Sequence, residues 1–462
     1  MNPQGALSLL PYQEEGVQFL RKHRAALLTD EMGLGKTVQA IALINQEPAI
    51  WAVLIICPAT LKAVWRSELE RWLHRRDLSI CTIDSTRWKE ASIIIINYDR
   101  LYQHEMELRV RTWDLIVADE CHYLKSSHTR RTQIATRLRA HRRLAMSGTP
   151  LLNRPRELLP VLTWLDSIIW PHTKWHEFGL RYCGAVWNGF GWEYRGATHL
   201  EELGNCLRST VMLRRTKAEV LPELPSKFRS VVELAPGTNL ARLVQAELHA
   251  FEQYLQRQGD PDKPLEQRTR ELSQAYRDAV RTLRYLSDDT LGDNLAKARH
   301  AVALAKVPLI GKFVDELFLS GSGKLTIFCH HRDVISGLEK LLTAYHPVLL
   351  HGGTSQAARM EAVKRFQNDP LCRVFIGNIV AAGVGITLAP ASAHCLFAEL
   401  SWVPAEITQA EDRLHRIGTR GNVLVQHLVL VGSLDAVLVR TLLAKQKILD
   451  RILLSEEEMK IT

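Results

Sequence analysis

This chain of 462 residues contains no run of eighteen apolar residues, roughly the shortest stretch that a membrane-spanning helix needs. Its first residues, Met1 to Gly5, also lack the charged and apolar regions of a signal peptide. Both absences argue against a membrane protein and against export. The sequence therefore predicts an intracellular protein with no membrane partner, in the cytoplasm or nucleoid of a bacterial or phage source or in the nucleus of a eukaryotic one.

The eight cysteines of the chain include no Cys-x-x-Cys pair. Their wide spacing argues against a zinc module and against a disulfide framework, and it favours reduced, mostly buried thiols. The sequence also shows no repeat of solenoid period and no low-complexity tract. These absences leave an ordinary globular protein.

The chain does have length and positive charge. Its 462 residues exceed one ordinary core and predict two or three domains. Lysine and arginine number 59 against 50 aspartates and glutamates, which gives a formal net charge of +9. A basic surplus favours a polyanionic partner through counterion release, although many basic proteins bind no nucleic acid.

Short apolar runs recur in both halves of the chain, each followed by turn residues and then a helical pattern. Continuous Val, Ile and Leu strands between helices are typical of parallel sheets covered on both faces, so the fold class is α/β with two parallel-sheet lobes. The predicted strands are Ala25–Thr29, Val53–Cys57, Ile93–Ile96, Leu115–Ala118 and Arg143–Met146 in the first half, and Leu325–Cys329, Val348–Leu350, Arg373–Gly377, His394–Ala398 and Val423–Val431 in the second.

The stretch between the two sets, from Arg154 to about Leu319, lacks strand runs and is predicted to be mostly helical. We therefore expect an N-terminal lobe over residues 1–235 that carries a helical protrusion at about 154–215. The C-terminal lobe is expected over residues 236–462, with a helical insertion at about 236–319.

A glycine-rich loop at residues 30–37 (Asp-Glu-Met-Gly-Leu-Gly-Lys-Thr) follows the first predicted strand and precedes a helical stretch. Gly33 and Gly35 let backbone N–H groups turn inward around phosphate oxygens, and the start of the helix adds its positive dipole end. Lys36 is expected to reach the β- and γ-phosphates of ATP, and Thr37 to hold Mg²⁺ through its hydroxyl. The loop departs from the strict pattern at its first position, where an aspartate replaces glycine.

An acidic motif at residues 119–122 (Asp-Glu-Cys-His) ends the predicted strand Leu115–Ala118. Carboxylates at the C-terminal end of a buried strand point into the ligand crevice of an open α/β sheet. Asp119 is expected to hold Mg²⁺ through water, and Glu120 to orient or deprotonate the attacking water. Residues 147–150 (Ser-Gly-Thr-Pro), after another predicted strand, are expected to sense the γ-phosphate.

Residues 409–418 form a second candidate element of the site, and their pattern looks helical until Gly418. Gln409, Arg413 and Arg416 lie at i, i+4 and i+7, which predicts that they share one helix face. Two guanidinium groups on one face suit the charge that develops on a transferring phosphoryl group. Arginines supplied by a second lobe would make hydrolysis depend on lobe closure. A salt-bridged surface helix is the alternative for this segment taken alone.

Together the motifs resemble the superfamily-2 helicase-like ATPases, and within them the SWI/SNF-type DNA translocases. The resemblance runs from Leu10 to about Asp450, and it implies two RecA-like parallel-sheet P-loop lobes with helical insertions. It is carried by residues 10–13 (Leu-Pro-Tyr-Gln), 30–37, 56–58 (Ile-Cys-Pro), 119–122, 147–150 and 409–418. The chain departs from the family at Ile379-Val380, where Thr-Arg is common, and at Thr419, where Gln is usual.

Three stretches are similar to the annealing-helicase branch of that family, whose members remodel forked or unpaired DNA. They are residues 178–183 (Phe-Gly-Leu-Arg-Tyr-Cys), 328–331 (Phe-Cys-His-His) and 397–402 (Phe-Ala-Glu-Leu-Ser-Trp).

The resemblance also implies roles for single residues. Gln13 would read the adenine edge, Gln409 would join the arginines at the nucleotide, and Gly383 and Gly385 would bring backbone near the phosphates. Contacts to DNA phosphates are implied for Thr60, Lys62, Asn97, His331, Gly352 and Asn378.

We therefore expect an enzyme, a DNA-stimulated ATPase that uses ATP and Mg²⁺ to move along and remodel double-stranded or forked DNA. A strand-separating DNA or RNA helicase is the alternative among enzymes. An ATP-gated scaffold whose lobes clamp a protein partner is the alternative outside them.

Overall fold

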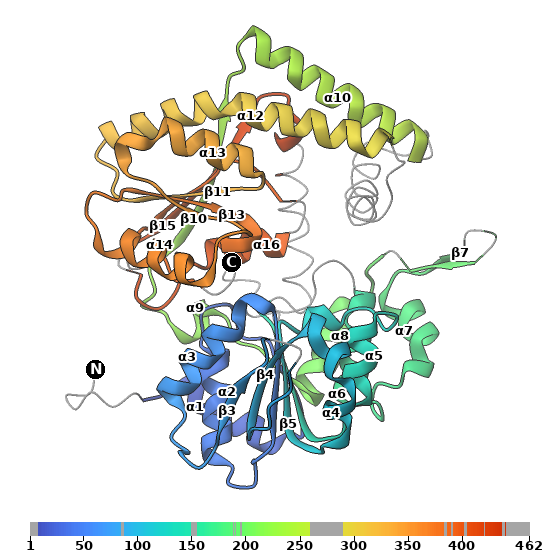
Figure 1. Ribbon diagram of the computed structural model, residues 1–462. Coiled ribbons are helices and arrows are strands. Elements are labelled where there is room, and N and C mark those ends of the chain that lie inside the picture. Colours follow the sequence, from blue (N-terminus) through green and yellow to red (C-terminus); the bar gives the residue numbers. More distant parts are fainter. Residues whose placement is uncertain are drawn as a thin grey trace. The chain divides into compact units, whose positions relative to one another are not determined.

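The computed structural model of the chain describes residues 8–84, 87–148, 155–187, 189, 191–194, 196–258, 290–382, 386–389, 391–401, 404–419, 421–436 and 439. These residues form two compact units, one that ends at Leu224 and one that begins at Pro225 (Figure 1). None of the helices in these ranges combines the length and the apolar composition that a bilayer span needs.

In the described part of the first unit, seven parallel strands form one sheet in the order β3-β4-β2-β5-β6-β1-β9. The five strands predicted in this half are confirmed, because their continuous apolar runs are buried on both faces. The strands are β1 (Ala25–Leu28), β2 (Val53–Cys57), β3 (Ile80–Thr82), β4 (Ile93–Asn97), β5 (Trp113–Asp119), β6 (Ala140–Met146) and β9 (Met212–Leu213).

Helices cover both faces of this sheet. Leu28 and Val117 point to the face covered by α1, α2 and α3, and Leu27 and Ile116 point to the face covered by α4, α5, α6 and α8. The helices are α1 (Pro11–Lys22), α2 (Lys36–Gln46), α3 (Lys62–Trp72), α4 (Glu105–Val110), α5 (Arg130–Arg137), α6 (Leu159–Leu165) and α8 (Leu200–Thr210). Because β5, β6 and β1 are neighbours in the sheet, the segments that follow these three strands meet at one edge.

The protrusion predicted at 154–215 is helical in large part, but it also contains a hairpin. After α7 (Trp175–Tyr182), β7 (Val186–Trp187) pairs antiparallel with β8 (Trp192–Glu193). In Figure 1, β7 extends outward from the region of α7 and α8. Two-residue strands are too short to produce a periodic apolar pattern, so the sequence did not predict them.

In the described part of the second unit, six parallel strands form a sheet in the order β10-β15-β14-β11-β13-β12. Five of them are the predicted strands of this half. The strands are β10 (Lys227–Leu234), β11 (Leu325–Cys329), β12 (Val348–Leu350), β13 (Val374–Asn378), β14 (His394–Phe397) and β15 (Val423–Leu430).

The expected boundary after residue 235 is corrected by β10. This strand pairs with β15 along its whole length, from Lys227 opposite Val423 to Leu234 opposite Leu430, so it belongs to the second unit. Its alternating exposed and partly covered side chains make a weak strand signal, unlike the buried apolar runs of the other strands.

Long helices occupy the insertion predicted at 236–319. Of this stretch, α10 and α12 are described, and they pack against each other, as Figure 1 shows. Ile310 of α12 and Ile335 of α13 share an apolar cluster with Ile327 of β11, which fixes the insertion on one face of the sheet. Residues of α14, α15 and α16 lie in the cluster on the other face. The helices are α10 (Thr238–Gln258), α12 (Thr290–Leu319), α13 (Arg332–Leu341), α14 (Gln356–Asn368), α15 (Ile379–Ala382) and α16 (Pro404–Glu411).

Candidate nucleotide and nucleic-acid sites

The glycine-rich loop leaves β1 and ends at the first turn of α2. Gly33 and Gly35 have φ of 90° and 78°, a backbone region that glycine adopts without strain. A Cβ on Gly35 would also lie 2.5 Å from Gln13 Nε2, so a side chain at this position would displace the Gln13 amide. The loop therefore has the tight, inward-turning backbone that phosphate binding needs.

Lys36 lies inside this loop, at the start of α2. Its Nζ donates to the carbonyl oxygen of Asp30 at 2.6 Å. Burial lowers the pKa of Lys36, while the carboxylates of Glu120, Asp30 and Asp119 oppose that shift. The ammonium group thus faces both the loop and the acidic end of β5.

Gln13, the residue expected to read adenine, joins α1 to the loop. Its Oε1 accepts from Leu10 N–H at 3.0 Å, and its Nε2 donates to the carbonyl oxygen of Leu34 at 3.2 Å. The side chain is buried beside Gly35. It is therefore positioned at the rim of the loop.

Asp119 ends β5 with a well-defined hydrogen-bond environment. Its Oδ2 accepts from Trp65 Nε1–H at 2.8 Å, and its Oδ1 accepts from the backbone N–H of Glu120 at 3.0 Å. Burial, and next the neighbouring charge of Glu120, raise the pKa of Asp119 to about 7. Trp65 is a core side chain, and it also orients this carboxylate.

Glu120 adopts φ of 51°, a strained conformation for any residue other than glycine. Its Oε2 accepts from Ser147 Oγ–H at 3.1 Å and lies 3.3 Å from His122 Nδ1. Burial alone would raise the pKa of Glu120, but His122, Lys36 and Ser147 outweigh it and hold the pKa below its usual value. These three partners favour the charged form of the carboxylate at the end of β5.

Ser147 connects the two motifs that the sequence treated separately. It follows β6, which is the neighbour of β5, and its hydroxyl reaches across to Glu120. Gly148 is packed against Met32 and Lys36 of the loop. Thr149 and Pro150, the rest of this motif, lie outside the described residues.

Asp30, the departure from the strict loop pattern, has a clear structural role that the sequence did not predict. Its carboxylate is fully buried and accepts two bonds from Arg215, at 3.0 Å from Nε and 2.5 Å from Nη2. Gln39 of α2 bridges the pair, donating to Asp30 Oδ2 and accepting from Arg215 Nη2. Arg215 also donates to the carbonyl oxygen of Tyr12.

The segment around Arg215 runs beside the loop for several residues. Arg214 Nη1 donates to the carbonyl oxygen of Thr29 at 2.7 Å, and Glu31 N–H donates to the carbonyl oxygen of Arg215 at 2.9 Å. The backbone N–H of Lys217 donates to Glu31 Oε2 at 2.7 Å. Further along, Leu221 packs on Tyr12 and Leu34. The last residues of the first unit are thus attached to the loop.

In the second unit, the predicted arginine helix ends earlier than expected. α16 stops at Glu411, and residues 412–418 form turns, so Arg413 and Arg416 do not extend the helix face of Gln409. The turns are closed by bonds from Arg413 N–H to Ala410 O and from Leu414 N–H to Glu411 O. Gly383 and Gly385 lie outside the described residues.

The two arginines differ in their surroundings. Arg413 is only 9% exposed and donates to the carbonyl oxygens of Gln409 and Ile386. Arg416 is partly exposed, and its Nη1 donates to Thr387 Oγ1 at 2.8 Å. Thr419, where the family usually has Gln, accepts from the backbone N–H of Arg416 at 3.0 Å. Arg413 thus stabilises the turn, whereas Arg416 is more accessible.

The expected DNA contacts of the first unit fall into two groups. Thr60 is exposed in the turn after β2. Lys62 is instead paired with Asp84 and donates to the carbonyl oxygen of Ile83 at 3.0 Å. Asn97 is buried at the end of β4.

The expected DNA contacts of the second unit surround the start of α13. Asn378 donates to the carbonyl oxygen of His330 and accepts from backbone N–H groups at the start of α15. Gly352 is exposed. A Cβ added to Gly352 would lie 3.9 Å from Arg332 Nη2, so the guanidinium group of Arg332 is close to this turn. Arg332 is an exposed cation beside His331 that the sequence did not single out.

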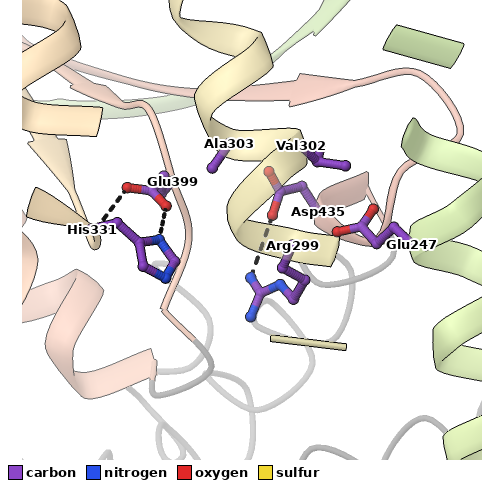
Figure 2. Close-up of a pocket in the computed structure, with 7 residues that line it drawn as sticks. All are labelled: Glu247, Arg299, Val302, Ala303, His331, Glu399 and Asp435. Atoms are coloured by element: carbon purple, nitrogen blue, oxygen red, sulfur yellow. Dashed lines mark hydrogen bonds and ion pairs between the residues drawn. The ribbon is translucent and has the colours of Figure 1, made fainter. Parts of the chain in front are cut away.

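His331 borders a small pocket beside the insertion helices. Its Nδ1 lies 2.6 Å from Glu399 Oε1, and Glu399 Oε2 accepts from the backbone N–H of His331 (Figure 2). Glu399 Oε2 also accepts from the backbone N–H of His330. Burial would raise the pKa of Glu399, but these partners lower it to about 2. The carboxylate therefore fixes the orientation of the His331 ring. Residues that line the pocket are Glu247, Arg299, Val302, Ala303, His331, Glu399 and Asp435.

Comparisons with known proteins bear on both units. The SNF2-related domain family matches residues 12–274, and the helicase conserved C-terminal domain family matches residues 309–418. A solved structure described as a Sulfolobus solfataricus SWI2/SNF2 ATPase core in complex with dsDNA is 24% identical, with a TM-score of 0.44, and covers 98% of this chain and 96% of that chain.

Curated relatives are similar over almost the whole chain. SWI/SNF-related matrix-associated actin-dependent regulator of chromatin subfamily A-like protein 1 of Xenopus tropicalis is 32% identical over 97% of this chain and 45% of its own length. Its Caenorhabditis elegans homolog is 32% identical over 99% of this chain and 64% of its own length. The human DNA annealing helicase and endonuclease ZRANB3 is 30% identical over 93% of this chain and 39% of its own length. The chain thus spans about half the length of these relatives.

Proposed function

Because this chain belongs to the SNF2-related family of helicase-like ATPases, we propose that it hydrolyses ATP to move along and remodel double-stranded or forked DNA. The observation that carries the proposal is Glu120, a charged carboxylate in a strained backbone, bonded to Ser147 and close to the lysine of a phosphate loop. Strain of this kind is found at functional sites. DNA as the partner is supported by the name of the annealing-helicase relative and by the net charge of +9.

ATP binding rests on the loop between β1 and α2. Its backbone N–H groups and the start of α2 suit the phosphates, and Lys36 supplies a positive charge to the β- and γ-phosphates. Gln13, which lies beside Gly35 at the rim of the loop, is proposed to read the adenine edge. Thr37 and Asp119 offer the hydroxyl and carboxylate oxygens that fit Mg²⁺, which would neutralise phosphate charge when bound.

Hydrolysis rests on Glu120. A carboxylate whose pKa is held low is charged at neutral pH and can accept a proton from the attacking water. Ser147 is bonded to that carboxylate and directly follows β6. A change at Glu120 on loss of the γ-phosphate would therefore shift Ser147 and the end of β6. Arg416 of the second unit would stabilise charge on the transferring phosphoryl group, with Gln409 nearby in sequence and Arg413 holding the turn.

Movement follows if closure of the two units on ATP changes where each holds the DNA backbone. Phosphate contacts carry no sequence information, so they suit a motor that travels along any sequence. Thr60 and Gly352 are exposed in turns after strands and remain the most accessible of the proposed contacts. His331 is also proposed as a contact, with its ring held in place by Glu399. Lys62, Asn97 and Asn378 are proposed to act mainly by shaping those loops.

The proposal is tested by ATP turnover at fixed salt with blunt duplex, forked duplex, single-stranded DNA and RNA. A translocase on duplex DNA is expected to be stimulated by both duplexes and far less by RNA, whose A-form groove and 2′-OH differ. Lys36→Ala, which removes the phosphate-binding charge, is the matched control. If RNA stimulated ATP turnover as strongly as duplex DNA, the strand-separating helicase would be favoured. If no nucleic acid changed the rate of ATP turnover, the ATP-gated scaffold would be favoured.

A further inference from the structure

The β7–β8 hairpin of the first unit presents two tryptophans to solvent. Trp187 and Trp192 are paired across the hairpin, with ring centroids 5.7 Å apart. Their exposed fractions are 55% and 44%. Such a pair stabilises a hairpin, but that contact leaves about half of each residue in water. Large apolar rings gathered on an exposed feature are typical of a binding site.

The stem beneath the two indoles is firmly held. Gly196 N–H donates to the carbonyl oxygen of Cys183 at 2.8 Å, and Gly184 N–H donates to Thr198 Oγ1 at 3.2 Å. A Cβ on Gly196 would lie only 3.0 Å from Gly184 Cα, so the two chains of the stem are in close backbone contact. The strands therefore leave the unit at a fixed place.

Trp192 has an additional support. Tyr194 packs over Gly179 of α7, where a Cβ would lie 2.5 Å from the ring, and its hydroxyl is 2.5 Å from His176 Nδ1. The His176 ring lies edge-on to Trp192, with centroids 6.0 Å apart. The indole is thus oriented by a chain of contacts that begins in the helix.

The exposed area suits a nucleobase better than a protein. A tryptophan covers about 150–250 Å² when fully buried, so two half-exposed indoles offer on the order of 200 Å². A stable protein interface needs about 800 Å² from each partner. An unpaired base has a flat π face of the right size, and stacking on an aromatic ring tolerates any base. Bases inside a duplex are already stacked, so they are not available to the hairpin.

We propose that Trp187 and Trp192, whose ring planes meet at 68°, form a stacking platform in which one indole stacks on an unpaired base of DNA and the other contacts the edge of that base, at the point where a duplex opens into a single-stranded arm. The inference rests on the proposed function and names its substrate more closely, as duplex DNA with an unpaired arm. The platform adds affinity for that arm, and the duplex itself is held elsewhere.

The test compares a forked duplex with a blunt duplex, using the full chain and 2-aminopurine as a fluorescent base at the first unpaired position. Trp187→Thr keeps a strand-forming residue but removes the π face, and Trp187→Phe keeps both. We expect Trp187→Thr to weaken binding of the forked duplex about tenfold and to abolish the quenching of 2-aminopurine. Binding of the blunt duplex stays unchanged, and Trp187→Phe retains most of the affinity. Trp192→Thr, the second variant, shows the same selective loss.

The matched control is Trp51→Thr, because Trp51 is also 53% exposed but lies outside the hairpin, beside Arg75. It leaves binding of both duplexes unchanged. The proposal is overturned if Trp187→Thr and Trp192→Thr bind the forked duplex like the wild type, as they would if a protein occupied the site. It is also overturned if both duplexes lose affinity equally. ATP turnover on the blunt duplex tests the proposed function separately, since that turnover does not need the platform.

Discussion

Arg215 forms a two-pronged ion pair with Asp30 in the interior of the first unit, with N···O distances of 3.0 and 2.5 Å. Asp30 stands at the position where the strict phosphate-loop pattern has glycine. Asp30, through its ion pair with Arg215, thus connects the phosphate loop to the segment that leads toward Pro225.

Replacing Asp30 by the glycine of the strict pattern is therefore expected to harm the protein. Asp30→Gly leaves the guanidinium of Arg215 buried without its carboxylate, and breaking a buried pair in this way costs about 3–5 kcal/mol. Urea unfolding of the full chain checks the loss. Asp30→Gly combined with Arg215→Met should recover part of it, because no charge is then left buried. A single Asp30→Gly variant as stable as the wild type would contradict the role of the pair.

Glu120→Gln is expected to separate ATP binding from hydrolysis. The amide keeps the size of the side chain and can still accept from Ser147, but it cannot take a proton from water. Turnover should fall by about 10²–10⁴-fold, while the Kd for ATP stays within a few-fold of the wild type. Steady-state turnover and fluorescent-nucleotide binding measure the two effects. Undiminished turnover would mean that another group is the base.

Arg416→Ala is expected to reduce ATP turnover, whereas Arg413→Ala is expected to reduce stability. Arg416 is partly exposed, so its loss should leave folding and ATP binding nearly intact but reduce DNA-stimulated turnover by about 10³-fold or more. Arg413 is buried and bonded to two carbonyl oxygens, so its loss should lower the stability of the second unit. Turnover and thermal unfolding of both variants check the distinction. If Arg416→Ala turns over normally, the closure scheme is wrong.

We expect the ionisation of Glu247 to make the stability of the protein depend on pH. Glu247 is only 2% exposed and lines the pocket of Figure 2 together with Asp435. Burial, and next the charge of Asp435, raise its pKa from 4.5 to about 7. The folded state therefore holds its proton more tightly than the unfolded state. This contribution to stability is fully present below pH 4.5 and is lost as the pH rises to about 7.

Glu247→Gln keeps the acceptor for the backbone N–H of Leu434 but cannot ionise. In the wild type, the unfolding free energy should fall by about 3 kcal/mol between pH 4.5 and 7 because Glu247 ionises. This fall should be absent in the Glu247→Gln variant. Urea unfolding of the wild type and the variant across that range measures the difference. Parallel pH profiles would show that Glu247 is not the group responsible.

The strands and the phosphate loop could be predicted from the sequence because their signals are local. Buried runs such as Ile93–Ile96 and the glycine spacing at 33–35 follow directly from what a covered sheet and a tight loop require. β10 could not, since its side chains are only half covered and its partner β15 lies almost 200 residues away.

The candidate site was predictable as a set of motifs but not as a set of contacts. Nothing local shows that Ser147 bonds Glu120, or that Lys62 is paired with Asp84. The turn that holds Arg413 and Arg416 is set by hydrogen bonds to Ala410 and Glu411, which the i, i+4 spacing of a helix does not reveal. Distant side-chain pairs and local turn bonds thus together decided which predicted residues are accessible.

The attachment of residues 214–221 to the phosphate loop has a mechanical consequence. Glu31 holds the backbone of Arg215 and Lys217 directly, and Leu221 rests on Leu34, only three residues before the chain crosses to the other unit. A change in the shape of the loop would therefore reach the segment that leads to Pro225 through these contacts. We therefore expect ATP binding at the loop to change the conformation of residues 214–221 directly.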